Sequence, residues 1–166
     1  MPESSPRNTP RAFKVVDIQI VNPALIDAHR WMHTFADAWR NLHPDQADAD
    51  PVGFAIWAPV MFRGRGSEDP VEVASSVDLP GCFFDKAFLK KARAWTYSFQ
   101  ESWMANEIDP EDVDVRAIDW IWAPCMYAER GNADPIELAK QVQIPDDLFG
   151  MIFWGYTRYD PNADAP

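Results

Sequence analysis

A six-residue motif that occurs twice limits how this chain can fold. Residues 56–61 read Ile-Trp-Ala-Pro-Val-Met, and residues 121–126, which lie 65 positions later, read Ile-Trp-Ala-Pro-Cys-Met. The same offset holds downstream of the motif, and an offset of 64 holds upstream of it. Six of the eight tryptophans therefore fall at paired positions, which are 31 and 95, 39 and 103, and 57 and 122. Because tryptophan is rare, we interpret the chain as a tandem duplication of a helical unit of about 64 residues.

The duplication predicts one domain and not an open array of repeats. Two copies are too few for a solenoid, which needs about three repeats to bury its faces. We expect the copies to pack on each other about a pseudo-two-fold axis. The predicted domain covers residues 12–160, and its repeats span about 22–85 and 86–150. Residues 1–11 are expected to form a flexible tail, and residues 161–166 a second one.

Composition and charge narrow the class of protein. The length of 166 residues suits one domain, for which about 100–200 residues are usual. No apolar run reaches the roughly 18 residues of a membrane helix, and the first ten residues lack the order of a secretory signal. The formal net charge of −11 disfavours binding to nucleic acids and to anionic membranes, because both require positive charge. It suits a protein partner with a basic surface.

The two cysteines indicate a reducing compartment. Cys82 and Cys125 lie in apolar runs, at positions that the duplication does not relate. We interpret them as buried, reduced thiols and expect a cytoplasmic location. A disulfide or a reactive thiol is the alternative.

The first half of the chain carries clear helix signals. Residues 12–21 alternate like a half-buried strand and predict an extended N-terminal arm. Asn22-Pro23 then has the residue types of a helix start, with Asn as N-cap and Pro at the first position. Apolar residues recur at three- and four-residue steps from Leu25 to Leu42, which predicts an amphipathic helix to about His43. An acidic loop is expected from Pro44 to Asp50.

The segments that contain the repeated motif are ambiguous. Residues 53–62 alternate as a strand would, but in the second copy the residues around Asp119 and Ala123 fall on one helical face. We therefore predict helices bent at Pro59 and Pro124, and a mainly α fold. The alternative is an α+β fold, with residues 12–20, 53–62 and 116–127 as strands of a small sheet.

Two short helices and one long helix complete the predicted architecture. Asp69-Pro70 and Asp134-Pro135 have the residue types of capped helix starts. After Pro80 the pattern predicts a long helix with one apolar stripe. The stripe consists of Phe84, Phe88, Ala92, Trp95, Phe99 and Trp103.

One histidine pair is the strongest candidate for metal chemistry. His29 and His33 are four residues apart, so both project from one helix face, and Asp37 follows one turn later. A complete site needs further ligands from elsewhere. The second copy has Arg93 and Tyr97 at these positions, so the pair is not part of the duplicated pattern. We expect no metal and no cofactor, and keep a metal site as the alternative.

Two acidic loops repeat the pattern Asp-x-x-Asp-x-Asp. The positions are Asp45, Asp48 and Asp50 in the first copy, and Asp109, Asp112 and Asp114 in the second. Calcium binding by an EF-hand loop also requires a glycine and a distant glutamate, and neither has the right spacing here. We interpret the loops as solvated helix caps, with Asp45, Asp48, Asp109 and Asp112 as candidates for contact with a basic partner.

The functional prediction depends on the C-terminal apolar run. Its residues Phe149, Ile152, Phe153 and Trp154 lack the helical continuation that follows the matching segment of the first copy. Either the N-terminal arm or another protein must cover them, and Trp154, Tyr156 and Tyr159 are candidate anchors. We therefore expect a non-enzymatic acidic interaction module that binds another protein or a second copy of itself, such as an accessory subunit, an assembly component or an inhibitor of a nucleic-acid-binding protein. A metal-dependent enzyme or metal-binding protein that uses His29 and His33 is the alternative.

Overall fold

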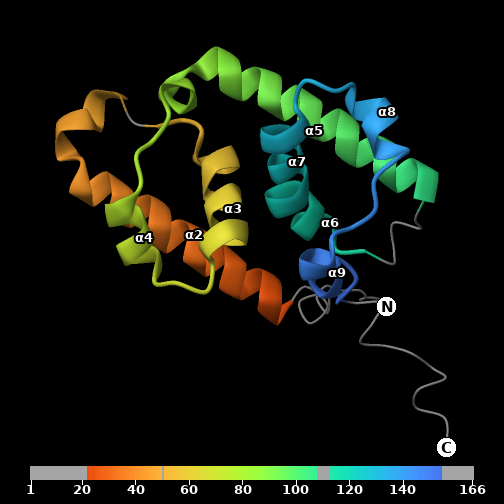
Figure 1. Ribbon diagram of the computed structural model, residues 1–166, viewed down its shortest axis with the longest axis horizontal. Helices are drawn as coiled ribbons and strands as arrows, with labels where there is room; N and C mark the ends of the chain where they lie inside the picture. Colours follow the sequence, from red (N-terminus) through yellow and green to blue (C-terminus); the bar gives the residue numbers. More distant parts are fainter. Residues whose placement is uncertain (1–21, 50, 108–112, 155–166) are drawn as a thin grey trace, which may run out of the picture.

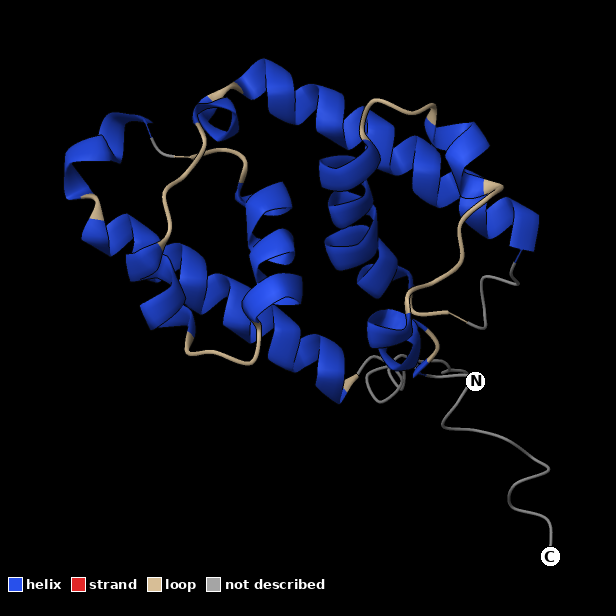
Figure 2. Cartoon of the chain, viewed as in Figure 1, coloured by secondary structure: helices blue, strands red, loops and turns tan. Residues whose placement is uncertain are grey.

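The computed structural model describes residues 22–49, 51–107 and 113–154, and this part of the chain is helical without a strand (Figures 1 and 2). The prediction of a mainly α fold is confirmed. The alternative that placed strands at 53–62 and 116–127 is wrong, because both segments are helical. The predicted N-terminal arm and both tails lie outside the described residues.

The helices follow one another with short connections. In chain order they are α2 (Pro23–Leu42), η1 (Pro44–Ala49), α3 (Phe54–Arg65), α4 (Pro70–Ser76), η2 (Gly81–Phe84), α5 (Lys86–Glu107), α6 (Val115–Ala117), η4 (Ile118–Trp122), α7 (Ala123–Arg130), α8 (Pro135–Ala139) and α9 (Asp146–Ile152). Helices η1 and η2 have 3₁₀ geometry, and η4 is a π-helical turn.

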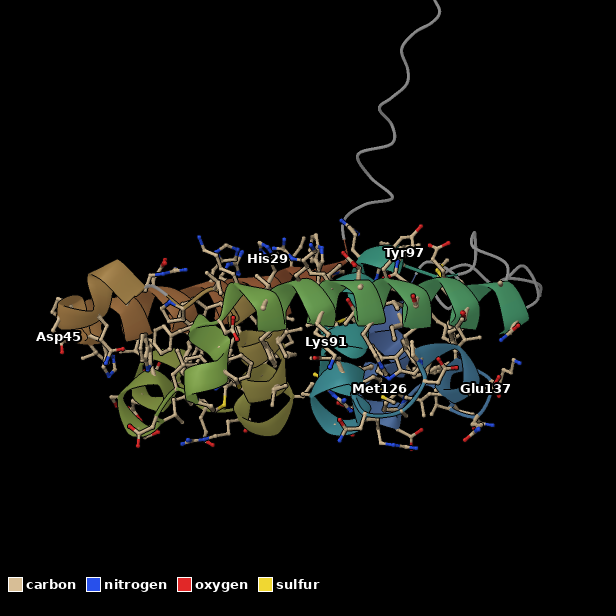
Figure 3. All side chains as sticks on the ribbon, turned by 90° about the horizontal axis from the view of Figure 1, so that it is seen from above. His29, Asp45, Lys91, Tyr97, Met126 and Glu137 are labelled. Atoms are coloured by element: carbon tan, nitrogen blue, oxygen red, sulfur yellow. The ribbon has the colours of Figure 1, made fainter. Side chains whose placement is uncertain are left out.

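The long helices form one layer and shorter helices form a second. Figure 3 shows α2 and α5 on one side, with α3, α4, α7 and α8 beneath them. Helix α4 packs on α2, α8 packs on α5, and α3 packs against α7 at the centre (Figure 1). The buried side chains of both layers belong to one hydrophobic core.

Helix α2 begins where the sequence predicts. The Asn22 side chain accepts a hydrogen bond from the backbone N–H of Leu25 at 3.3 Å, and Pro23 takes the first helical position. The buried Asn22 amide also donates to the Met151 carbonyl at 2.9 Å and to the Asp114 carboxylate at 3.2 Å. This cap therefore joins the start of α2 to the C-terminal part of the described chain.

The prolines of the repeated motif lie in different local settings. Pro59 is inside α3, whereas Pro124 occupies the first turn of α7, directly after the π turn η4. A proline has no N–H to donate to the preceding turn, and a first-turn position is the place in a helix where this loss matters least. The wider turn of η4 thus divides the second motif helix in two.

Two sequence predictions in this region are wrong in detail. The segment from Pro44 is a 3₁₀ helix to Ala49 and not a loop. The helix after Pro80 is interrupted, because Asp85 is extended and its carboxylate accepts from the backbone N–H of Ala87 at 2.9 Å. That cap starts α5 at Lys86 and leaves Phe84 on the separate turn η2.

Helix η2 approaches α3 closely at a glycine. The backbone N–H of Gly53 donates to the Phe83 carbonyl at 2.8 Å. A Cβ atom at position 53 would overlap the Phe83 side chain, so this position requires glycine. The contact turns Phe83 toward Trp57, whose ring centroid lies 6.2 Å away.

The first tryptophan of each long helix makes a matching polar contact. The indole N–H of Trp31 on α2 donates to the Glu68 carbonyl at 2.9 Å. The indole N–H of Trp95 on α5 donates to the Ala133 carbonyl, also at 2.9 Å. The first bond ties α2 to the loop before α4, which begins at the proline after Asp69. The second ties α5 to the loop before α8, which begins at the proline after Asp134.

The aromatic core contacts also occur in pairs. Phe35 meets Trp57 edge to face at 4.9 Å between ring centroids, and Phe99 meets Trp122 in the same way at 5.1 Å. Both tryptophans are buried, with 4% and 0% of their surface exposed. Such pairs stabilise a core beyond the area they bury, by about 0.5–1.5 kcal/mol each.

These contacts predict equal losses of stability in the two halves of the chain, by which we mean the predicted repeats at about 22–85 and 86–150. Replacing either fully buried phenylalanine, as Phe35→Ala or Phe99→Ala, should lower the free energy of unfolding by about 3–5 kcal/mol in urea titrations, because each leaves a cavity in the aromatic core. The control Tyr97→Ala removes a ring that is 65% exposed and should change it by less than about 0.5 kcal/mol. A large loss at one phenylalanine with a negligible loss at the other would contradict this account.

Candidate functional site

A cleft of about 400 Å³ lies between the long helices, at the junction of the two halves. We call it the junction cleft. Its floor is apolar and is formed by Met32 and Ala36 of α2, Ile56 and Pro59 of α3, and Pro124 of α7. Both prolines of the repeated motif therefore line the same cleft.

Polar and aromatic side chains form the rim of the junction cleft. They are His29, His33 and Arg40 from α2, Arg93 and Thr96 from α5, and Asp119 and Trp120 from η4. Figure 3 places His29 of α2 and Tyr97 of α5 on the same outer face of the long-helix layer. The cleft thus opens on the face that carries the predicted histidine pair.

The two histidines contact each other. Their Nε2 atoms are 3.2 Å apart, so one ring must donate the hydrogen bond and the other must accept it. The pair can therefore hold this bond only while at least one ring is neutral. The pKa of His29 is lowered from its usual value, mainly because neighbouring atoms partly shield the ring from water. Electrostatic repulsion from His33 lowers this pKa further.

The neighbours of His29 shape the rim. Its ring lies 5.0 Å from the ring of Trp120, between centroids, and Trp120 itself is 36% exposed. The carboxyl of Asp119 is next to Trp120 in the chain, and partial desolvation raises the pKa of this carboxyl. Arg40 lies over the Phe54 ring at 4.5 Å and forms an ion pair with Asp37 at 3.5 Å.

The histidine pair does not extend to a larger ligand set in the described ranges. Within 22–49, 51–107 and 113–154, no group of three or more His, Cys, Asp or Glu side chains is arranged to hold a metal ion. Asp37, which follows His33 by one turn, is engaged by Arg40. The structure thus supplies two imidazoles to a metal, and a complete site needs more.

Two of the four predicted acidic contact residues lie in the described part of the chain. Asp45 is exposed on η1, Asp48 lies on the same turn, and Asp109 and Asp112 lie outside the described residues. Asp114 has a structural role, because its carboxylate caps α6 and forms an ion pair with Arg116 at 2.7 Å. Burial alone would raise the pKa of Asp114, but hydrogen bonds from Arg116 and Asn22 lower it.

The C-terminal apolar run divides into a buried face and an exposed face. Leu148, Met151 and Ile152 are buried in the core, whereas the sequence analysis expects Ile152 to be covered by the N-terminal arm or by another protein. Phe149 is 41% exposed and meets the ring of Phe153 at 4.9 Å. Trp154 is half-buried, and Tyr156 and Tyr159 lie outside the described residues.

A second depression runs beside the exposed face of α9. This α9 groove has a volume of about 380 Å³. It is lined by Trp103, Val142, Gln143, Ile144, Asp146, Phe149 and Phe153. The single carboxylate of Asp146 lies at an otherwise mainly apolar surface.

One of the two thiols differs from the prediction. Cys125 is buried, and burial raises its pKa to about 11. Cys82 is exposed on the turn η2, where the next residue, Phe83, accepts the hydrogen bond from Gly53. The structure does not pair the two cysteines.

An ion pair connects α3 in the first half of the chain with α9 in the second half. The guanidinium of Arg63 on α3 binds both carboxylate oxygens of Asp147 on α9, at 3.0 and 2.9 Å. This bidentate geometry is the strong form of a charged hydrogen bond. It holds α9 in place and so fixes the wall of the α9 groove.

Comparisons with known proteins give no relative. No protein-family model matches the chain, and neither the curated proteins nor the solved structures that were compared contain a match. Among the described helices, none has both the length and the apolar character to cross a membrane.

Sequence reasoning missed most of the rim of the junction cleft. The histidines were identified by their spacing, but Arg93, Asp119 and Trp120 come from other helices. A signal was present in the offset of 64, which pairs His29 with Arg93. The sequence alone does not show that these two positions lie close together, because their proximity depends on the packing of α3 on α7.

The lowered pKa of His29 predicts a pH-dependent contribution to stability. The folded state binds this proton less readily than the unfolded chain, so the contribution is complete above the usual pKa of about 6.5 and is lost as pH falls from there through the lower pKa of the folded state. In His29→Gln the urea midpoint should therefore fall less between about pH 7.5 and 5.5 than in the parent. Equal falls in the two proteins would contradict this assignment.

The histidine pair also gives a prediction for metals. Adding zinc or iron should leave the melting temperature of the parent unchanged, because two imidazoles do not complete a coordination sphere. The double variant His29→Ala with His33→Ala should behave in the same way. A metal-dependent rise in the parent that disappears in the double variant would favour the metal-binding alternative.

Proposed function

We propose that this chain is a non-enzymatic, acidic protein-interaction module that docks an amphipathic, basic segment of another protein in the α9 groove. The single observation that carries the proposal is the exposure of Phe149 at the mouth of a groove with an apolar lining. Exposed apolar patches on folded chains usually mark interaction sites.

The lining of the groove supports an apolar anchor in the partner. The buried ring of Trp103 and the half-buried side chains of Ile144 and Phe153 line the groove beside Phe149. Aromatic side chains in desolvated pockets carry most of the binding energy at many interfaces. Trp154, Tyr156 and Tyr159 follow α9 in sequence, and we propose that they extend this anchor set.

Charge supports a basic character of the partner. The chain has a net charge of −11, and the carboxylate of Asp146 lies in the groove itself. We propose that Asp45, Asp48, Asp109 and Asp112 add to a negative field that steers a positive segment toward the groove. Such steering changes the rate of association more than the affinity.

We infer that the scaffold of this module is a tandem duplication of a unit of about 64 residues. The support is the paired geometry of the two halves, in which the indole bonds of Trp31 and Trp95 and the edge-to-face contacts of Trp57 and Trp122 have the same form. The unpaired cysteines support a reducing, cytoplasmic setting for the chain.

A synthetic peptide tests the groove. The probe is a helical peptide of about 16 residues with leucines at i, i+3, i+4 and i+7 and lysines elsewhere, measured by fluorescence anisotropy. Phe149→Ser should weaken its binding at least about tenfold, because the variant removes the exposed anchor. A peptide with glutamate in place of lysine should bind more weakly than the lysine peptide.

A matched variant and a second measurement control this test. Val71→Ser changes an apolar residue of α4 with similar exposure, 48%, and should leave peptide binding unchanged. Equal binding by parent and Phe149→Ser would refute the groove as the docking surface. If sedimentation of the parent alone shows a dimer that Phe149→Ser abolishes, the occupant is a second copy of the chain and not a basic partner.

A further inference from the structure

The lining of the junction cleft carries more basic than acidic side chains, in contrast to the chain as a whole. Among its lining residues are His29, His33, Arg40 and Arg93, whereas Asp119 is the only acidic one. The chain as a whole has 26 acidic and 15 basic residues. A concentration of basic groups in one cleft of an acidic protein raises the local concentration of anions there.

We propose that the junction cleft binds a small aromatic carboxylate, with its ring between Trp120 and the apolar floor and its carboxylate directed to Arg93 and the histidine pair. This inference concerns a different surface from the α9 groove and does not rest on the proposed function. Three features of the cleft support this ligand class: its shape, its aromatic wall and its polar groups.

Size and shape suit a small molecule. The volume of about 400 Å³ lies within the roughly 300–1,000 Å³ of small-molecule sites. Such sites have apolar linings with a few convergent polar groups. The apolar residues here are on α2, α3 and α7, and the polar groups come from α2, α5 and η4, so the packing of the two halves creates the site.

The aromatic wall favours a flat apolar body. Trp120 exposes 36% of its surface at the rim, and the ring of His29 lies 5.0 Å from it. The Met32 side chain and Pro59 form the opposite, buried surface. The Trp120 ring also has the Arg116 guanidinium 6.0 Å from its centroid, so a ligand ring that enters the cleft would contact the part of the indole that remains exposed.

The polar groups favour a carboxylate with one negative charge. Arg93 is exposed and has no ion pair with any residue in the described part of the chain, unlike Arg40, which is engaged by Asp37. A guanidinium binds a carboxylate with two parallel hydrogen bonds. The histidine pair keeps at least one neutral ring and still offers N–H donors, and the nearby Asp119 disfavours a ligand with more negative charge.

Paired positions of the two halves carry the same residue type in the core but different residue types at this cleft. The offset of 64 pairs Trp31 with Trp95, and these residues are identical and make equivalent bonds. The same offset pairs His29 with Arg93, which differ in chemistry although both line the cleft. Under the proposed duplication, the rim positions 29 and 93 have thus diverged to His and Arg, and the packing of the halves does not require these side chains.

Three probes of equal size test the ligand class. They are 2-naphthoate, the neutral 2-naphthamide and the cation 2-naphthylmethylamine, each titrated into the full-length protein by calorimetry. The proposal expects one site for naphthoate and at least tenfold weaker binding of the other two. The indole ¹⁵N–H resonance of Trp120 should shift during the naphthoate titration.

Three single variants locate the site. Arg93→Gln should weaken naphthoate at least tenfold and leave the amide unchanged, whereas Trp120→Ala should weaken both. Arg30→Gln is the matched control, because Arg30 lies on α2 outside the cleft, where it pairs with Asp27 at 3.6 Å, and it should change neither. Melting temperatures confirm that each variant is folded, and the Trp120 shift in the parent tests contact without any substitution.

The following results would overturn the proposal. One is that naphthoate binds no more tightly than the amide or the amine, and another is that Arg93→Gln leaves naphthoate binding intact. The others are that the Trp120 resonance does not move during the titration, and that no probe shows saturable binding.

Discussion

The perpendicular packing of indole on indole is the contact on which this fold depends. Trp39 of α2 meets Trp57 of α3 at 86° between ring planes, and Trp103 of α5 meets Trp122 at 89°. The indole N–H groups of Trp39 and Trp122 have no hydrogen-bond partner in the described chain, which costs about 1–3 kcal/mol for each buried donor. The aromatic core therefore outweighs two unsatisfied donors, and each contact fixes a central helix against a long one.

The position of the junction cleft follows from this packing. Trp57 and Trp122 belong to the repeated motif, and Pro59 and Pro124 follow them by two residues. Once the indoles are held against the long helices, the two buried prolines lie where α3 meets α7 and form part of the floor of the cleft. Side chains from both long helices then reach the rim. One motif thus explains both the core and the cavity above it.

Sequence reasoning was most successful where local chemistry decides the structure. The cap at Asn22, the Asp-Pro helix starts and the aromatic stripes of the long helices are all found in the structure. It failed in two places after Pro80. Asp85 ends one helix and caps the next through its bond with the Ala87 N–H, and Cys82 lies exposed on η2, beside the contact of Phe83 with Gly53. Neither effect leaves a periodic signal in the sequence.

The candidate sites show the same division. The spacing of His29 and His33 identified one side of the junction cleft, but the opposite side depends on how the halves pack. On α9, Phe149 and Ile152 are three residues apart and lie on neighbouring parts of one helix face, yet Ile152 is buried and Phe149 is exposed. Tertiary packing and not periodicity makes this difference. The candidate anchors Tyr156 and Tyr159 lie beyond the described residues, so their role remains a prediction.

Hydrogen exchange of the indole N–H groups tests the central claim, that the two halves have equivalent cores. In ¹⁵N spectra of the intact protein, the indole protons of Trp31 and Trp95 should exchange slowly and with similar protection, because each donates a bond of the same length to a backbone carbonyl. The exposed indole of Trp120 should exchange fast and serves as the internal reference. If one of the two buried indoles exchanged as fast as Trp120 while the other stayed protected, the halves would not share a common core, and the account would be wrong.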